Sequence, residues 1–180
     1  MDEFIEILDE NALPTGEKCL KSVAHKNGLY HASVHIWLYT KSKEVLIQKR
    51  KENKDTFPNL WDISVAGHIA YKEKPLTAAL REIEEEIGLC SKENELQYIG
   101  TSTHKNIHAE DLIDHELHHI YISELKTDIK DLKIQEEEVA AIKLIPISSL
   151  QNELEHNAAK YVPHGMEYYT RVFDEIHKLL

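Results

Sequence analysis

The sequence predicts an α/β layered domain, and two observations lead to that prediction. Short runs rich in β-branched and aromatic residues alternate along the chain with longer stretches whose apolar residues recur at helical spacing. The 180 residues contain no internal repeat and no long linker rich in glycine, proline or serine, so nothing in the sequence marks a second domain. We therefore expect one domain over residues 1 to 180.

The predicted strands dominate the middle of the chain. Residues 33 to 39 are rich in β-branched and aromatic side chains, and a polar break at 41 to 43 separates them from the run 45 to 48. This pattern predicts a β-hairpin. Four further short runs, each bounded by charged or turn residues, predict strands at 61 to 66, 96 to 102, 117 to 123 and 139 to 146.

Three stretches are predicted as helices, at 75 to 87, 148 to 160 and 165 to 180. The first begins at Pro75, which a first helical turn tolerates, and Gly88 follows as a stop signal. The second opens on a capping-box pattern from Ser148 to Gln151. Apolar residues at helical spacing in the third predict a face that packs on the core.

Composition limits the classes of partner. The formal net charge of −11 argues against binding nucleic acid through its phosphate backbone, which requires clustered lysine and arginine. The chain starts with acidic residues, and no apolar run approaches the length that spans a bilayer, so we expect no membrane partner. Cys19 and Cys90 show no metal-ligand spacing. We therefore predict a cytoplasmic protein.

The helix predicted over residues 75 to 87 carries acidic residues beside its apolar stripe. Glu82, Glu85 and Glu86 are surface neighbours at helical spacing, so their charges repel. Arg81 can relieve this repulsion by pairing with Glu85, and so can a divalent cation held by oxygen ligands. An acidic helix face by itself is usually only solvated. The spacing of the residues around this helix distinguishes between these alternatives.

That spacing runs from Gly67 through five residues to Glu73, and then through seven residues to the segment Arg81 to Leu89. It resembles the Nudix box at every specified position. The resemblance implies a Nudix-type α/β/α sandwich with a mixed central β-sheet and flanking helices. It also implies an enzyme that hydrolyses a diphosphate linkage in a nucleoside diphosphate derivative or another small organic diphosphate.

The resemblance further implies a metal site on the box helix. Glu82, Glu85 and Glu86 would bind or orient Mg²⁺ or Mn²⁺, with the Gly67 carbonyl as another ligand. A diphosphate is multiply negative and repels a water nucleophile, so a cation is needed to neutralise its oxygens and activate water. Hard oxygen ligands on a rigid helix suit Mg²⁺.

Two other groups of residues have expected roles by the same resemblance. Glu73 and Arg81 would brace the loop and the helix. Family members also draw a further carboxylate from a later segment, as a ligand or as the general base. Glu116 is the favoured residue for that role. The alternatives are Glu110, Asp114 and the run Glu136 to Glu138.

The resemblance outside the box, over roughly residues 4 to 150, is to the subgroup that includes type I isopentenyl-diphosphate isomerases. It rests on the segments 23 to 25, 29 to 31, 35 to 37, 46 to 50 and 61 to 68. Those isomerases use a cysteine immediately before the Gly-His pair, where this chain has Ala66, which cannot transfer a proton. Hydrolysis is therefore favoured. Isomerisation and a non-catalytic nucleotide-sensing module are the alternatives.

The isomerase-like subgroup also suggests a second metal site. Its ligands would map onto His25, His31, His68, Asp114 and Glu116, all of which can bind a metal. In the alternative interpretation, His25 and His31 are loop or strand-edge residues and His68 only shapes the turn before the helix. The family resemblance also makes a homodimer the expected assembly.

Overall fold

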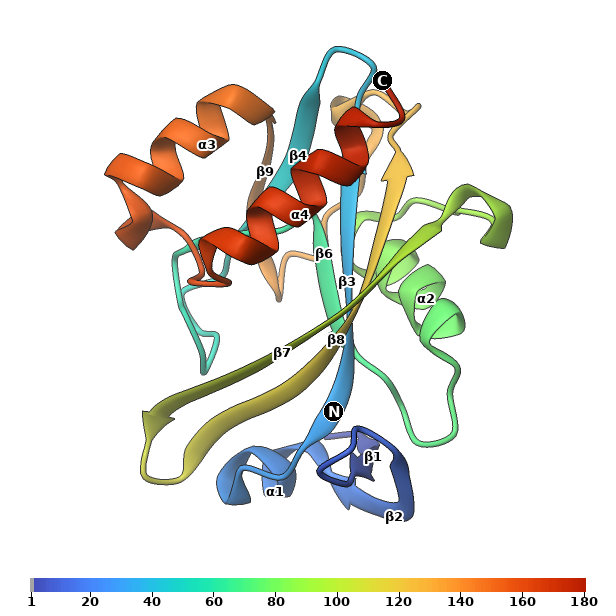
Figure 1. The fold of residues 1–180 in the computed structure, drawn as a ribbon, viewed down its shortest axis with the longest axis vertical. Coiled ribbons are helices and arrows are strands. Elements are labelled where there is room, and N and C mark those ends of the chain that lie inside the picture. Colours follow the sequence, from blue (N-terminus) through green and yellow to red (C-terminus); the bar gives the residue numbers. More distant parts are fainter. Residues whose placement is uncertain (1) are drawn as a thin grey trace.

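The computed structural model describes residues 2 to 180 as a mixed β-sheet between layers of helices (Figure 1). The strands are β1 (Phe4–Leu8), β2 (Pro14–Leu20), β3 (His31–Tyr39), β4 (Glu44–Arg50), β5 (Trp61–Asp62), β6 (Val65–His68), β7 (Gln97–Ala109), β8 (Leu112–Glu124) and β9 (Val139–Pro146). The α-helices are α1 (Lys21–Asn27), α2 (Pro75–Ile87), α3 (Ile147–His156) and α4 (Met166–His177). The predicted α/β class with a mixed sheet is confirmed.

Strand β3 lies at the centre of the sheet. It runs parallel to β8 along its whole length and antiparallel to β6. The turn predicted at 41 to 43 does connect β3 to β4, but these strands pair only at Tyr39 and Val45. The predicted hairpin is therefore wrong beyond its turn, because β4 instead pairs along its length with β9.

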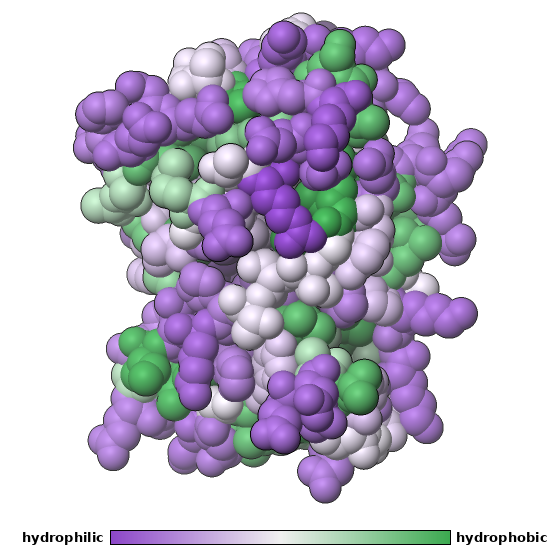
Figure 2. All heavy atoms as spheres, in the orientation of Figure 1, coloured by the Kyte–Doolittle hydropathy of each residue, from purple (hydrophilic) through white to green (hydrophobic). Residues whose placement is uncertain are grey.

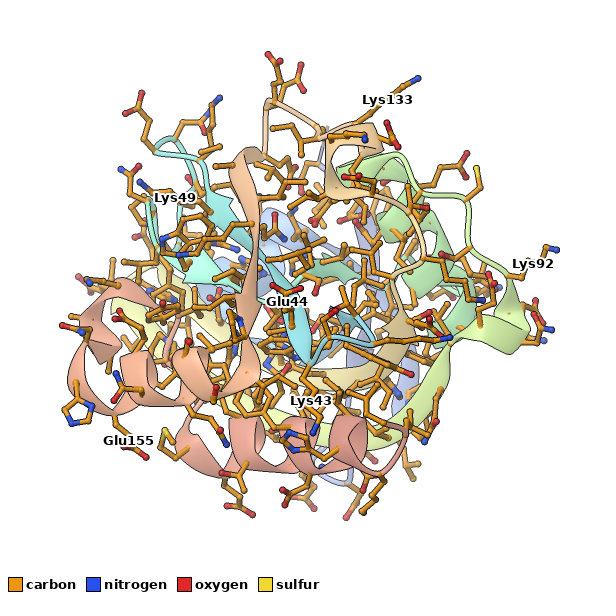
Figure 3. The ribbon with its side chains drawn as sticks, turned by 90° about the horizontal axis from the view of Figure 1, so that it is seen from above. Lys43, Glu44, Lys49, Lys92, Lys133 and Glu155 are labelled. Carbon is orange, nitrogen blue, oxygen red and sulfur yellow. The ribbon has the colours of Figure 1, made fainter. Side chains whose placement is uncertain are left out.

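The core consists of two apolar layers, one on each face of the sheet. Successive strand side chains point to opposite faces, and in β3 this sends Val34 and Ile36 toward α2 while Trp37 packs toward α3 and α4. Both faces of β3 are buried, which explains why its sequence is almost continuously apolar after His35. Figure 3 shows α3 and α4 along one side of the sheet and α2 on the other.

Helix α2 has the predicted bounds, with Pro75 in its first turn and Gly88 as a left-handed C-cap at φ 66°. Helix α3 differs from its prediction. It begins after Pro146, which serves as the N-cap, so Ser148 falls inside the first turn and the predicted capping box does not form. The predicted packing face of the last helix is confirmed, because Phe173 and its apolar neighbours in α4 are buried.

The sequence patterns predicted no element between residues 4 and 27, where the structure has β1, β2 and α1. Strand β2 is almost wholly exposed and lacks the apolar alternation by which strands are recognised. Helix α1 has only seven residues, with Gly28 as its left-handed C-cap. These elements form from tertiary pairing, which a local pattern does not reveal.

The surface agrees with the acidic composition. The face in Figure 2 is mostly hydrophilic, and its apolar side chains lie in separate patches. Lys92, Lys133 and Glu155 point away from the body of the molecule in Figure 3. Among residues 2 to 180, no helix is both long enough and apolar enough to cross a bilayer.

Candidate active site

A cavity of about 280 Å³ opens where β3 and β8 begin. These parallel strands place His31 opposite Glu116 and Ser33 opposite His118. Alternate residues share one face of a strand, so Ser33 on β3 lines the cavity, as do Glu116 and His118 on β8. Further along the same faces the side chains become apolar and join the core under α4. The polar beginnings of two apolar strands thus form the cavity floor.

Helix α2 brings two of the box carboxylates, Glu82 and Glu85, to the lining of this cavity. Glu82 and Glu86 are buried, whereas the Glu85 side chain remains about half exposed, at 53%. Glu82 packs directly against Gly67 of β6, where an added Cβ would overlap the Glu82 carboxyl group. Only glycine lets the helix carboxylate come this close to the strand backbone, which accounts for the residue at this position of the box.

Arg81 ties the box together. Its Nη1 donates to Glu82 Oε1 at 2.6 Å and to Glu85 Oε2 at 3.1 Å. Its Nε and Nη2 donate to the Glu73 carboxylate at 3.0 and 2.9 Å, and Nη2 also donates to the His68 carbonyl. The pairing of Arg81 with Glu85 expected from helical spacing is present. The contacts with Glu73 match the expected bracing of loop and helix.

Burial makes Glu82 and Glu86 difficult to ionise. It raises the pKa of Glu82 to about 7, although Arg81 opposes the rise. It also raises the pKa of Glu86 well above the ordinary value, and repulsion from Glu82 adds to this shift. Within residues 2 to 180, the side chain that donates a hydrogen bond to the Glu86 carboxylate is the neutral amide of Gln48, at 2.9 Å. A divalent cation would relieve both penalties.

Three imidazoles and a carboxylate meet beside the box. One ligand atom each from His25, His31, His68 and Glu116 lies within 4.8 Å of the others, and these four residues are called the His–Glu cluster below. His31 Nε2 and His68 Nε2 lie 3.7 and 3.5 Å from Glu116 Oε1. From the sequence, Glu116 was favoured as the additional carboxylate that binds the box metal ion or acts as the general base. The structure brings its carboxylate together with the histidines.

The donor set of the His–Glu cluster fits a metal ion. His31 Nε2 is fully enclosed and has no hydrogen-bond partner among residues 2 to 180, an arrangement that costs free energy unless something binds there. Burial, together with the neighbouring imidazoles, lowers the pKa of His25 to about 4, so this ring stays unprotonated as a ligand must. Although burial opposes its ionisation, the nearby His31 and His68 hold the pKa of Glu116 well below its ordinary value.

Asp114 lies at the edge of the His–Glu cluster. Its Oδ1 is 3.6 Å from His25 Nδ1, and its Oδ2 is 2.8 Å from His108 Nε2. Of the other carboxylates considered from sequence, Glu138 lines the cavity and pairs with Lys54. Glu110, Glu136 and Glu137 are exposed and do not line it.

Another part of the cavity lining, which the sequence did not predict, is formed by His35, His118 and His164, called the histidine wall below. The His35 and His118 rings stack at 3.8 Å between centroids, and the His164 ring meets His35 edge-on at 5.1 Å. Polar residues occupy every second position at Asp114, Glu116 and His118, and this alternation was a sequence signal for His118. His164 precedes α4 without any local pattern.

The comparisons with known proteins fit this geometry. A model of the NUDIX domain matches residues 29 to 165. The chain belongs to the NUDIX family. The resemblance predicted from the box is therefore confirmed, and with it the assignment to pyrophosphohydrolase-type Nudix enzymes.

Two Nudix hydrolases are among the curated relatives. The chain is 36% identical over 158 residues to an uncharacterized Nudix hydrolase of Clostridium acetobutylicum, covering 86% of this chain and 75% of that protein. This chain is 30% identical to Nudix hydrolase 3 of Arabidopsis thaliana, and the match covers 97% of this chain. The match spans only 23% of the length of the Arabidopsis protein.

The predicted likeness to the isomerase subgroup is also found. The chain is 33% identical over 122 residues to an isopentenyl-diphosphate Δ-isomerase of Serratia proteamaculans, which covers 68% of this chain and 66% of that enzyme. Among solved structures, a Deinococcus radiodurans protein superposes with a TM-score of 0.69 over 94% of this chain and 98% of its own, at 16% identity. That structural likeness concerns the fold alone.

Proposed function

We propose that the NUDIX protein hydrolyses a diphosphate linkage in a nucleoside diphosphate derivative or another organic diphosphate. The observation that carries this proposal is the intact box in three dimensions. Glu82 is seated against Gly67, and Arg81 binds Glu73, Glu82 and Glu85 at one rim of the cavity. Arg50 and Lys54 also line that cavity, so it offers positive charge for a phosphate as well.

The proposal assigns Mg²⁺ or Mn²⁺ to Glu82, Glu85, Glu86 and the Gly67 carbonyl. When bound, the cation would neutralise phosphate oxygens and lower the pKa of a bound water. The chain supplies the positioning. Arg81 fixes the orientation of Glu82, and the Gln48 amide holds one oxygen of Glu86. Glu116, on the cavity floor, is the favoured carboxylate to accept a proton from the attacking water.

Replacement of Glu85 by glutamine tests the proposal. Glu85 lines the cavity, whereas Glu84 beside it on α2 is exposed and does not. We expect Glu85→Gln to lower kcat on the best diphosphate substrate by at least 10²-fold, and Glu84→Gln to leave kcat within about twofold. Phosphate release would be measured over nucleoside, sugar-nucleotide, coenzyme and prenyl diphosphates. Parental activity of a folded Glu85→Gln protein would end the proposal.

The proposal includes a second metal ion at the His–Glu cluster. It is supported by the enclosed, unpartnered Nε2 of His31 and by the convergence of four ligand atoms. We expect His25→Ala and His68→Ala each to reduce bound metal by about one equivalent per chain, measured by elemental analysis after dialysis against Mn²⁺ or Zn²⁺. The matched control is His115→Ala, outside the cluster on β8. Unchanged stoichiometry in both cluster variants would remove the second site.

Prenyl diphosphate isomerisation is the second candidate, because the His–Glu cluster coincides with the ligand set expected from that subgroup. Ala66 lines the cavity at the position where an isomerase requires a cysteine. The chain therefore lacks an ionisable group at this position. Isopentenyl diphosphate in the substrate panel distinguishes the two, because an isomerase forms a dimethylallyl product and releases no phosphate. Binding of a nucleotide without turnover across the panel would instead favour a sensing module.

We also infer the setting in which this enzyme works. Residues 1 to 180 are proposed to act as a single catalytic domain on a small-molecule diphosphate, in the cytoplasm, as a homodimer. The net charge of −11 supports a partner that is neither nucleic acid nor an anionic membrane surface. The family resemblance supports the dimer, which light scattering of the purified protein would test.

A further inference from the structure

The histidine wall is built differently from the His–Glu cluster, although both line one cavity. Each of its imidazoles has one ring nitrogen held by a specific partner. His35 Nδ1 lies 2.9 Å from the Tyr168 hydroxyl, His118 Nδ1 lies 2.7 Å from Ser33 Oγ, and His164 Nε2 lies 2.7 Å from Asp62 Oδ1. These partners come from β3, β5 and α4, so the rings are fixed by the fold rather than by one another.

The second nitrogen of each ring has no hydrogen-bond partner among residues 2 to 180. The fully enclosed polar side-chain atoms that lack a partner there are His31 Nε2 and Asp114 Oδ1. The free nitrogens of the histidine wall therefore keep some surface, and all three rings line the cavity. Fixed polar groups that face a cavity without a protein partner are the usual means of orienting a ligand.

The fixed partners determine what two of these nitrogens offer. The Trp37 indole can only donate, so the Tyr168 oxygen accepts its N–H at 3.0 Å and directs its own proton to His35. His35 Nε2 then presents an N–H donor to the cavity. The Asp62 carboxylate accepts from His164 Nε2, which leaves Nδ1 of that ring for a ligand. A hydroxyl group can both donate and accept, so it can accept from His35 and pair with the second nitrogen as well.

The histidine wall stands next to the proposed reaction centre. His118 Nδ1 lies 3.4 Å from Glu116 Oε2, while the other oxygen of that carboxylate faces the His–Glu cluster. A diphosphate at the metal sites would place its organic half against the wall. Apart from Gly67, the apolar residues that line the cavity are Phe57, Ala66 and Val162. A hydrocarbon chain would therefore leave the imidazole nitrogens unpaired, at a cost in binding free energy.

We propose that His35, His118 and His164 determine the substrate class, and that they select a diphosphate whose organic half carries hydroxyl groups, such as a sugar, over a prenyl diphosphate. This inference rests on the proposed hydrolysis. It deepens that proposal by naming what the second half of the substrate must offer.

The test compares two neighbours on β8. His118 faces the cavity, whereas His119 faces the opposite side of the sheet and lines a different pocket. For the parent, His118→Leu, His164→Leu and His119→Leu, kcat/KM would be measured on ADP-ribose, uridine diphosphate glucose and geranyl diphosphate. We expect the parent to favour at least one sugar diphosphate by tenfold or more over the prenyl compound. Both cavity variants should lower that ratio at least tenfold, mainly through KM, and His119→Leu should not change it.

Calorimetric binding of the same compounds to the Glu85→Gln protein, with and without His118→Leu, separates this inference from hydrolysis itself. Selective binding of a sugar diphosphate that His118→Leu abolishes would support the histidine wall even if no compound were cleaved, and then only the hydrolytic proposal would fail. A parent that favours geranyl diphosphate would overturn the inference. So would cavity variants that weaken sugar and prenyl compounds equally.

Discussion

Two buried carboxylates beside strand β4, Asp62 and Glu86, have opposite surroundings. Arg50 and Gln48 lie two residues apart on β4 and donate to them, a guanidinium to Asp62 at 3.2 Å and a neutral amide to Glu86 at 2.9 Å. Burial would raise the pKa of Asp62, but His164 and Arg50 lower it below its ordinary value. The pKa of Glu86 instead rises well above its ordinary value.

This difference shows which of the two buried carboxylates the fold compensates by itself. Asp62 is fully compensated, with a further hydrogen bond from the Ile63 N–H, and it serves to hold the histidine wall. In the part of the chain that the structure describes, Glu86 has no cationic hydrogen-bond partner, and its surroundings favour an added cation. Asp62 is therefore paired within the chain, whereas Glu86, which the proposed function assigns to a metal ion, has a raised pKa and a neutral side-chain donor.

The largest expected effect is on Asp62. Asp62→Asn would leave Arg50 and His164 without their anion, so we expect the free energy of unfolding to fall by about 3 to 5 kcal/mol. Because the folded pKa lies below the unfolded value of about 3.9, the ionised group stabilises the fold above about pH 4. This contribution is lost as the pH falls further. Urea unfolding measured between pH 3 and 7 checks both statements.

Asp55→Asn is the matched control, because Asp55 is exposed on the loop that precedes Asp62. Its free energy of unfolding should stay within about 0.5 kcal/mol of the parent. If the Asp62→Asn protein were as stable as this control at pH 7, Asp62 would not be stabilised by Arg50 and His164. The contrast between Asp62 and Glu86 would then be wrong.

The sequence predicted the box half of the cavity well, because its signals are local. Pro75, Gly88 and the carboxylate spacing lie within one helix and its ends, and the structure has that helix at the predicted bounds. The role of Gly67 also follows a fixed spacing to Glu82. The site roles assigned to these residues stay predictions until the variants are measured.

The histidine half could not be predicted in the same way. His31 lies opposite Glu116 only because β3 and β8 are parallel neighbours, and no local pattern gives the register of strands whose paired residues are 85 positions apart in the chain. The extent of the predicted hairpin between residues 33 and 48 was wrong for the same reason, because the turn was visible in the sequence and the long-range pairing of β4 with β9 was not. His164 reaches Asp62 across an even longer separation.

A smaller change in the free energy of unfolding, of opposite sign, is expected when Glu86 is replaced. In metal-free protein, Glu86→Gln removes a buried carboxyl group whose ionisation the fold opposes, so we expect the free energy of unfolding at pH 7 to rise by about 1 kcal/mol. The folded pKa is raised, so ionisation of Glu86 costs stability increasingly as the pH rises above the unfolded value of about 4.3. The difference between variant and parent should vanish near pH 4 and grow toward neutrality.

Urea unfolding in a chelator, with Glu84→Gln as the exposed control on the same helix, measures this difference. Added Mg²⁺ should reverse the order, because a cation that binds the folded parent stabilises it by mass action and the variant has lost a ligand. A Glu86→Gln protein less stable than the parent in chelator would mean that Glu86, like Asp62, is already compensated within the chain. The raised pKa of Glu86 would then no longer support a metal site on α2, and only the His–Glu cluster would remain as a candidate metal site.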